Sequence, residues 1–151
     1  FRIMKYAALA LLVAMLGLTE AKMQNVTVKG VAVCNKFRMA NVLVELWEKD
    51  PLSPNDLLAT IHTNRDGEFQ LSGGNDEAFS EIAPFVKFHH TCATSSNKEQ
   101  SCKRMTEYVV PAEYIWSEET PAKDRKTYNM DYVTLDIFTT GEKEHCESKT
   151  N

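Results

Sequence analysis

The stretch DLLATIHTNRDGEFQLSG (residues 56–73) places two short apolar runs on either side of a turn. Residues 57–63 and 68–72 each have the length and alternation of a half-buried β-strand. Between them, residues 64–67 are typical of a tight turn, because Gly67 can adopt positive φ at no steric cost. The stretch therefore predicts a β-hairpin.

Similar β-type runs occur on both sides of this stretch. They cover residues 26–34, 41–48, 83–92, 104–110 and 128–139. Only Asp76 to Ile82 is expected to form a short helix or helical turn. About seven short strands with at most one short helix predict an all-β fold, an antiparallel β-sandwich.

The N-terminal residues have the features of a secretory signal peptide. Lys5 precedes the apolar run Ala7 to Leu18, and small residues follow it. We expect cleavage after Ala21, which divides the chain into a signal peptide (1–21) and one β-sandwich domain (22–151). Since no second apolar run is long enough to span a bilayer, we expect no transmembrane segment.

The charge of the chain bears on its partners. The formal net charge is −4, with 17 basic and 21 acidic residues and no basic stripe. This balance argues against nucleic acid as a partner.

Secretion determines how the four cysteines and one glycosylation sequon are interpreted. Four cysteines in an oxidising compartment predict two disulfides, for which three pairings exist. We expect Cys92–Cys102 as a local bridge across a polar loop, and Cys34–Cys146 between the first strand and the C-terminal tail. Asn25 begins the sequon Asn-Val-Thr, so it is either a glycosylation site or an unmodified polar residue.

The run VKFHHTC (86–92) raises the question of a metal site. Successive side chains of a strand point to opposite faces, so His89 and His90 cannot both reach one metal. The spacing from Cys92 to Cys102 also lacks the pattern of a structural zinc site. We expect His90 near the core beside a disulfide and His89 exposed, with no metal or cofactor.

No catalytic set is present in the sequence. It contains neither a Gly-x-Ser-x-Gly elbow nor a glycine-rich phosphate loop, and paired cysteines leave no free thiol. We therefore predict a non-enzymatic protein.

Leu43 and Trp47 form a candidate interaction patch. If Val42, Val44 and Leu46 face the core, Leu43 and Trp47 face outward. Outward apolar side chains of this size often mark a contact site. The alternative is that a loop, a glycan or a second subunit covers them.

Several segments together resemble the nematode transthyretin-like proteins. They are VTVKGVAVCNKFRMANVLVELWEKD (26–50), the opening stretch (56–73), IAPFVKFHHTC (82–92) and VVPAEYI (109–115). The most specific features are Gly30 with Cys34, LWEKD, the 56–73 block and His90 with Cys92. The resemblance implies a secreted, disulfide-bonded, prealbumin-like (Ig-like) sandwich with an extracellular recognition role.

Distant relatives of that family include thyroid-hormone carriers and 5-hydroxyisourate hydrolases. The hydrolases end in a Tyr-Arg-Gly-Ser signature, whereas this chain reads Glu-His-Cys-Glu-Ser at residues 144–148. The hydrolase activity is therefore not carried over. A hormone-type pocket would require an oligomer with a cavity between subunits.

The leading hypothesis is a secreted, extracellular binding module for a protein, lipid or glycan partner. The alternative is a carrier of a small apolar ligand within an oligomer, and an enzyme of the hydroxyisourate hydrolase type ranks third.

Overall fold

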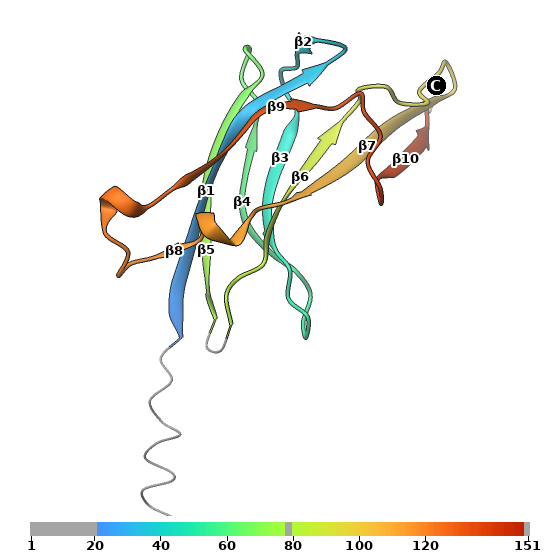
Figure 1. Cartoon of the computed structure of the whole chain (residues 1–151). Helices are drawn as coiled ribbons and strands as arrows, with labels where there is room; N and C mark the ends of the chain where they lie inside the picture. The colour runs from blue at the N-terminus through green and yellow to red at the C-terminus, as the bar shows by residue number, and fades with distance from the viewer. Residues whose placement is uncertain (1–20, 78–79, 150–151) are drawn as a thin grey trace, which may run out of the picture.

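The computed structural model describes residues 21–77 and 80–149 and confirms the all-β sandwich. Two five-stranded sheets pack face to face around one hydrophobic core (Figure 1). The predicted signal peptide lies outside the described residues, apart from Ala21. Within the described part of the chain, no helix has the length and apolar character needed to cross a membrane.

The first sheet is built on the long strand β1 (Lys22–Cys34), with which every other strand of this sheet pairs. The partners are β2 (Phe37–Arg38), β5 (Glu68–Glu77), β8 (Trp116–Ser117) and β9 (Thr127–Thr134). The pairing of β9 with β1 is parallel, and the other pairings are antiparallel.

The second sheet is antiparallel throughout. Its order is β10 (Lys143–Ser148), β7 (Gln100–Val109), β6 (Pro84–His90), β3 (Leu43–Glu48) and β4 (Asp56–His62). Its three inner strands β7, β6 and β3 are each paired on both sides, and β4 and β10 form its edges.

The hairpin predicted for residues 56–73 is wrong, although its turn is correct. Strand β4 belongs to the second sheet and β5 to the first, so the turn carries the chain from one sheet to the other. Gly67 has φ 70°, and a Cβ there would lie 2.7 Å from the carbonyl oxygen of Ala32. The Gly67 carbonyl accepts a hydrogen bond from the Ala32 N–H at 2.8 Å, which ties the turn to β1.

The core forms from the inward residues of both sheets, as the alternation predicts. Phe69 and Leu71 of β5 are 4% and 6% exposed. Phe69 meets Phe88 of β6 edge to face, with ring centroids 5.3 Å apart. Val42, Val44 and Leu46 are buried together with these residues, which confirms their predicted direction.

Among residues 21–77 and 80–149, the seven predicted strands are all present with shifted ends, and three further strands occur. Strands β2 and β8 are two residues long, and β10 has no inward apolar residues by which the sequence could have revealed it. The predicted helix at Asp76 to Ile82 is wrong, because Asp76 and Glu77 continue β5 along β1. Within the described residues, the only helical turns are 3₁₀ turns at Ala112–Tyr114 and Ala122–Asp124.

Candidate functional site

The outer face of the second sheet carries the residues predicted as an interaction patch. Leu43, Glu45 and Trp47 alternate along β3 with the buried residues Val44, Leu46 and Glu48. The outward direction of Leu43 and Trp47 is therefore confirmed. Both side chains are half-buried rather than fully exposed.

Trp47 belongs to an apolar row that crosses four strands, which we call the Trp47 row. The register places these four residues side by side: Leu57, Trp47, Phe85 and Val109. Val109 is 79% exposed and Leu57 49% exposed, whereas Phe85 is buried between them. An exposed apolar row that continues across neighbouring strands is a feature of contact surfaces.

A second, charged row lies beside the Trp47 row and holds Trp47 in place. The indole N–H of Trp47 donates to Glu45 Oε2 at 2.9 Å, and His89 Nε2 lies 2.9 Å from the same oxygen. Burial alone raises the pKa of Glu45, but the hydrogen bonds from Trp47 and His89 outweigh it and leave that pKa below its ordinary value. Glu45 is therefore an anchored carboxylate.

Lys87 completes this charged row. Its Nζ lies 4.9 Å from the centroid of the Trp47 ring and 3.4 Å from Glu107 Oε1. The ammonium thus rests on an aromatic face beside a carboxylate, an arrangement that favours a fixed position. The surface around Trp47 is consequently preorganised.

A small hollow of about 240 Å³ lies where the Trp47 row reaches Phe85 and Val109. Ala83, Pro84 and Phe85 contribute apolar surface to it, and Lys49 and Glu107 contribute opposite charges. The hollow therefore offers an apolar site flanked by charged groups, beside the exposed side chain of Val109.

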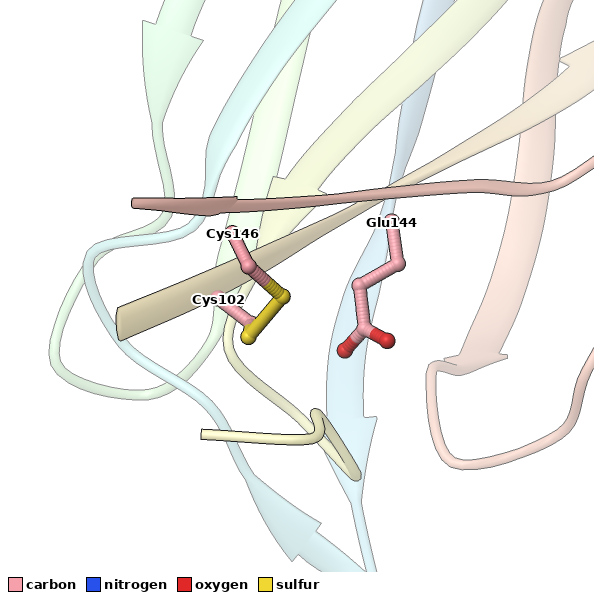
Figure 2. A group of neighbouring side chains, drawn as sticks. All are labelled: Cys102, Glu144 and Cys146. Carbon is pink, nitrogen blue, oxygen red and sulfur yellow. A yellow bond between two sulfur atoms is a disulfide. The ribbon is translucent and has the colours of Figure 1, made fainter. Parts of the chain in front are cut away.

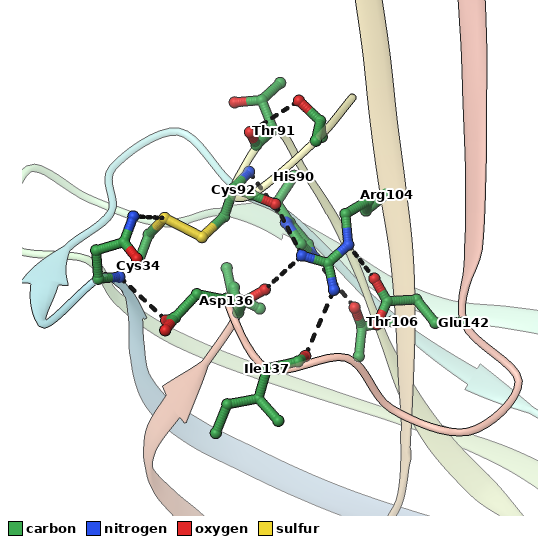
Figure 3. Close-up of a disulfide and its surroundings, with 12 residues drawn as sticks. Cys34, His90, Thr91, Cys92, Arg104, Thr106, Asp136, Ile137 and Glu142 are labelled. Carbon is green, nitrogen blue, oxygen red and sulfur yellow. Dashed lines mark hydrogen bonds and ion pairs between the residues drawn. A yellow bond between two sulfur atoms is a disulfide. The ribbon is translucent and has the colours of Figure 1, made fainter. Parts of the chain in front are cut away.

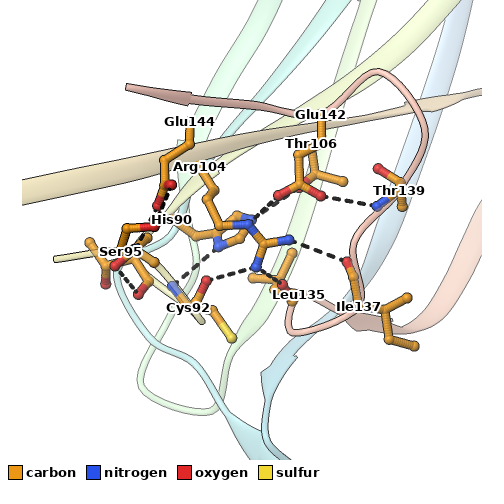
Figure 4. A network of polar contacts seen from close by, with 12 residues as sticks. His90, Cys92, Ser95, Arg104, Thr106, Leu135, Ile137, Thr139, Glu142 and Glu144 are labelled. Carbon is orange, nitrogen blue, oxygen red and sulfur yellow. Dashed lines mark hydrogen bonds and ion pairs between the residues drawn. The ribbon is translucent and has the colours of Figure 1, made fainter. Parts of the chain in front are cut away.

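A different polar cluster lies inside the sandwich, near the disulfides (Figures 3 and 4). Arg104 of β7 has no exposed surface and donates to Glu142 through Nε. One terminal nitrogen of Arg104 donates to the carbonyls of Cys92 at 2.9 Å and Leu135 at 3.0 Å. Burial raises the pKa of Glu142, but the hydrogen bonds from Arg104 and from the Thr139 N–H outweigh burial and leave that pKa below its ordinary value. Glu142 therefore stays ionised.

The cluster of Arg104 and Glu142 was not predicted from the sequence. The signal was present, because alternation along β7 places Arg104 on the same inward face as Cys102 and Thr106. A charged residue at a buried strand position requires a partner, and Glu142 lies 38 residues further along the chain. The N–H groups of Arg104 donate to Glu142 and to the backbone carbonyls of Cys92 and Leu135. We therefore infer that the cluster has a structural role and holds residues 135–142 against β7.

His90 lies beside this cluster, and its burial confirms the prediction. It is 3% exposed, its Nδ1 accepts from the Cys92 N–H at 3.2 Å, and its Nε2 lies 3.0 Å from Thr106 Oγ1. Burial, reinforced by the charge of Arg104, lowers the pKa of His90 to about 4. The prediction that His89 is exposed is wrong, because the bond to Glu45 holds it half-buried.

The neutral His90 makes the stability of the fold depend on pH. The unfolded chain takes up this proton near pH 6.5, whereas the folded chain resists it until about pH 4. Stability is therefore complete above pH 6.5 and falls as the pH decreases toward 4, by at most about 1.4 kcal/mol per pH unit. Urea unfolding at about pH 7.5 and about pH 5 should show a smaller loss for His90→Gln than for wild type.

A matched control for this prediction is the exposed His145. The His145→Gln variant should keep the pH dependence of wild type. Equal losses for wild type and His90→Gln would contradict the assignment to His90.

The structure corrects the predicted disulfide pairing. The bonds are Cys34–Cys92 and Cys102–Cys146, so the expected Cys92–Cys102 and Cys34–Cys146 are both wrong. Strand β6 ends at His90, and the chain then carries Cys92 to the end of β1 (Figure 3). Cys102 instead faces Cys146 directly across the β7–β10 ladder.

Glu144 approaches the second disulfide closely enough to resemble a three-ligand metal site (Figure 2). However, the two sulfurs are bonded to each other, and a disulfide sulfur is not the thiolate that binds metals. Both carboxylate oxygens of Glu144 also accept from Ser95, at 2.7 and 2.8 Å. Glu144 therefore holds the loop between β6 and β7, at Ser95, against β10.

The sequon residue Asn25 lies inside the first sheet. It pairs with Gly74 of β5 and Trp116 of β8 and is half-buried. A Cβ on Gly74 would lie 2.5 Å from Asn25 Oδ1, so the asparagine side chain crosses over this glycine. Glycosylation of Asn25 stays a prediction.

Comparisons with known proteins agree with this architecture. A model of the Transthyretin-like family matches residues 29–111. Transthyretin-like protein 16 of Caenorhabditis elegans is 49% identical over 127 residues, which cover 84% of this chain and 86% of that protein. Transthyretin-like protein 46 of the same organism is 37% identical over 142 residues, which cover 92% and 76%.

Among solved structures, a 9R-lipoxygenase from Cyanothece is similar with a TM-score of 0.39 and 17% identity. The match covers 76% of this chain but only 17% of the lipoxygenase chain, and it is too remote to support an argument. The family match, in contrast, runs through β1, the Trp47 row and Arg104, and the two relatives cover more than four fifths of the chain. The chain therefore belongs to the transthyretin-like family.

Proposed function

We propose that this protein is a secreted, non-enzymatic binding module that contacts an extracellular partner through the Trp47 row. The observation that carries the proposal is the apolar row across four strands of the second sheet, which is exposed at Leu57 and Val109 and half-exposed at Trp47. Support for secretion comes from the predicted signal peptide (1–21) and from two disulfides, which persist in oxidising compartments. The two relatives carry no enzymatic name.

The chemistry of the surface favours a protein among the protein, lipid and glycan partners considered above. The row next to Trp47 places Lys87 between Glu45 and Glu107, and its net negative charge disfavours anionic lipid headgroups. Trp47 and Val109 instead offer apolar contact area, and the adjacent hollow, which Phe85 lines, can receive an apolar side chain. Tryptophan is among the residues that dominate protein–protein binding energies.

The test is a binding comparison between wild type and Trp47→Ala. Proteins from extracellular fluid would be captured on the immobilised mature domain and identified, and the affinity of each purified partner would be measured. We expect Trp47→Ala to weaken binding by about thirtyfold, as for a central aromatic contact residue.

The matched control is Phe37→Ala, since Phe37 is an aromatic residue that is 78% exposed on β2, away from this face. It should bind as tightly as wild type. Equal binding by wild type and Trp47→Ala, or the absence of any partner beyond those captured by the reduced, unfolded chain, would refute the proposal.

A further inference from the structure

The outer face of the first sheet carries a polar groove that the proposed function does not use. Along β1, Lys29 and Val31 alternate with buried residues and point outward. The register extends each of them into a row across β5, β1 and β9 (Figure 1). The two rows are Gln70, Lys29, Asn129 and Glu68, Val31, Tyr132. All six residues line one hollow of about 580 Å³.

The shape of this groove depends on a glycine and a bulge. A Cβ on Gly30 would lie 2.9 Å from the Phe69 ring and 3.2 Å from the Asp131 carbonyl oxygen, so only glycine fits. Opposite Gly30, β9 contains an irregularity in its pairing, and Asp131 has φ 51°. Asn129 secures the bulge, because its Nδ2 donates to Asp131 Oδ1 at 2.7 Å and its Oδ1 accepts from the Asp131 N–H at 3.2 Å. Such bulges re-aim side chains near functional sites.

The lining of the groove combines amides, charged groups and an aromatic ring. Amides on Gln70 and Asn129 can both donate and accept hydrogen bonds. Within residues 21–77 and 80–149, the side chains of Gln70 and Lys29 form no hydrogen bond to the protein, so they are available to a ligand. Tyr132 is 63% exposed and offers an aromatic face with a hydroxyl at its edge.

The charges in the groove narrow the class of ligand. Lys29 is accompanied by the carboxylates of Glu68 and Asp131, so the groove has no excess of positive charge for a sulfated or phosphorylated ligand. Its many polar groups would remain unpaired against an apolar ligand, which is costly. A neutral sugar presents hydroxyls for the amides and carboxylates and an apolar ring face for Tyr132.

We propose that this groove binds a neutral oligosaccharide. The volume lies within the range of small-ligand sites and accommodates a short saccharide. The lining residues that carry this inference lie on the first sheet, although Ile61 and His62 of β4 in the second sheet border the hollow. None of the four residues of the Trp47 row lines it, so the inference stands independently of the proposed function.

The experiment uses the folded, disulfide-bonded mature domain, labelled with ¹⁵N. The neutral probes are chitotriose, cellotriose, maltotriose and mannotriose, each at up to about 10 mM. A heparin-derived hexasaccharide serves as the anionic probe. We expect at least one neutral trisaccharide to shift the amide signals of β1, β5 and β9, while the heparin fragment leaves them unchanged.

Variants test whether the binding occurs in this groove. Tyr132→Ala should weaken binding of that trisaccharide by about tenfold, and Tyr132→Phe should retain most of it because the ring persists. The matched control Phe37→Ala should bind as wild type. The proposal is overturned if no neutral probe binds, if only heparin binds, if the shifts map to β3 and β6, or if Tyr132→Ala binds as wild type.

Discussion

Replacing Arg104 by methionine is expected to lower the free energy of unfolding by about 3–5 kcal/mol. The guanidinium has no exposed surface and supplies hydrogen bonds to Glu142 and to the carbonyls of Cys92 and Leu135. Methionine has a similar length but no donors, so a buried carboxylate and two buried carbonyls lose their partners. Leaving one member of a buried ion pair uncompensated is among the most destabilising single changes.

Urea unfolding followed by circular dichroism measures this effect. The matched control is Lys103→Met, which makes the same kind of change at an exposed position of the same strand. It should alter stability by less than about 0.5 kcal/mol. The double variant Arg104→Met with Glu142→Leu should recover only part of the loss, because the carbonyls still lack donors. A loss below about 1 kcal/mol for Arg104→Met would show that the cluster does not fasten residues 135–142.

Removal of the Cys34–Cys92 bond is expected to cost about 4 kcal/mol. This bond closes a separation of 58 residues and joins the end of β1 in the first sheet to the chain that follows β6 in the second. The cost is the conformational freedom that the unfolded chain regains. The measurement is the urea midpoint of the double variant Cys34→Ala with Cys92→Ala.

The second disulfide is an internal comparison for the first. Cys102–Cys146 spans 44 residues, and on loop length alone the two bonds differ by only about 0.2 kcal/mol. However, all residues of β10 are exposed, so this strand can fray without opening the core. Cys102→Ala with Cys146→Ala should therefore cost clearly less and should speed amide exchange mainly in Lys143–Ser148. Equal costs for the two pairs would contradict this role of β10.

A peptide map of the non-reduced protein, recovered from the medium of cells that express the whole chain, checks the pairing directly. Cleavage after Lys98 separates Cys92 from Cys102, so each bond joins a distinct pair of peptides. The intact mass of the same sample reports two proposals: cleavage after Ala21 and glycan occupancy of Asn25.

The alternation of side chains made much of the fold predictable. A period of two is a local property of extended backbone, so Phe69, Leu71 and Val44 could be assigned to the core from their neighbours alone. The same rule indicated that Trp47 points outward and His90 inward. It failed for β10, whose six residues are all exposed.

Pairing between distant segments could not be predicted in the same way. Turn chemistry at residues 64–67 specifies a reversal of the chain, but it does not specify whether the two strands pair with each other or enter different sheets. The pairing of the cysteines was unpredictable for the same reason. Their number predicted two bonds, but the partner of Cys92 depended on where β6 ends and where the chain goes next.

The sequence by itself determined that this chain is an all-β sandwich, which residues form its core and that it belongs to one family. Only the tertiary structure decided that Arg104 meets Glu142, that Trp47 continues into a row across four strands, and that Lys29 and Tyr132 share a groove. The physical reason is range: strand faces follow from the backbone of neighbouring residues, whereas sites form between residues that register and sheet packing bring together from far apart in the chain.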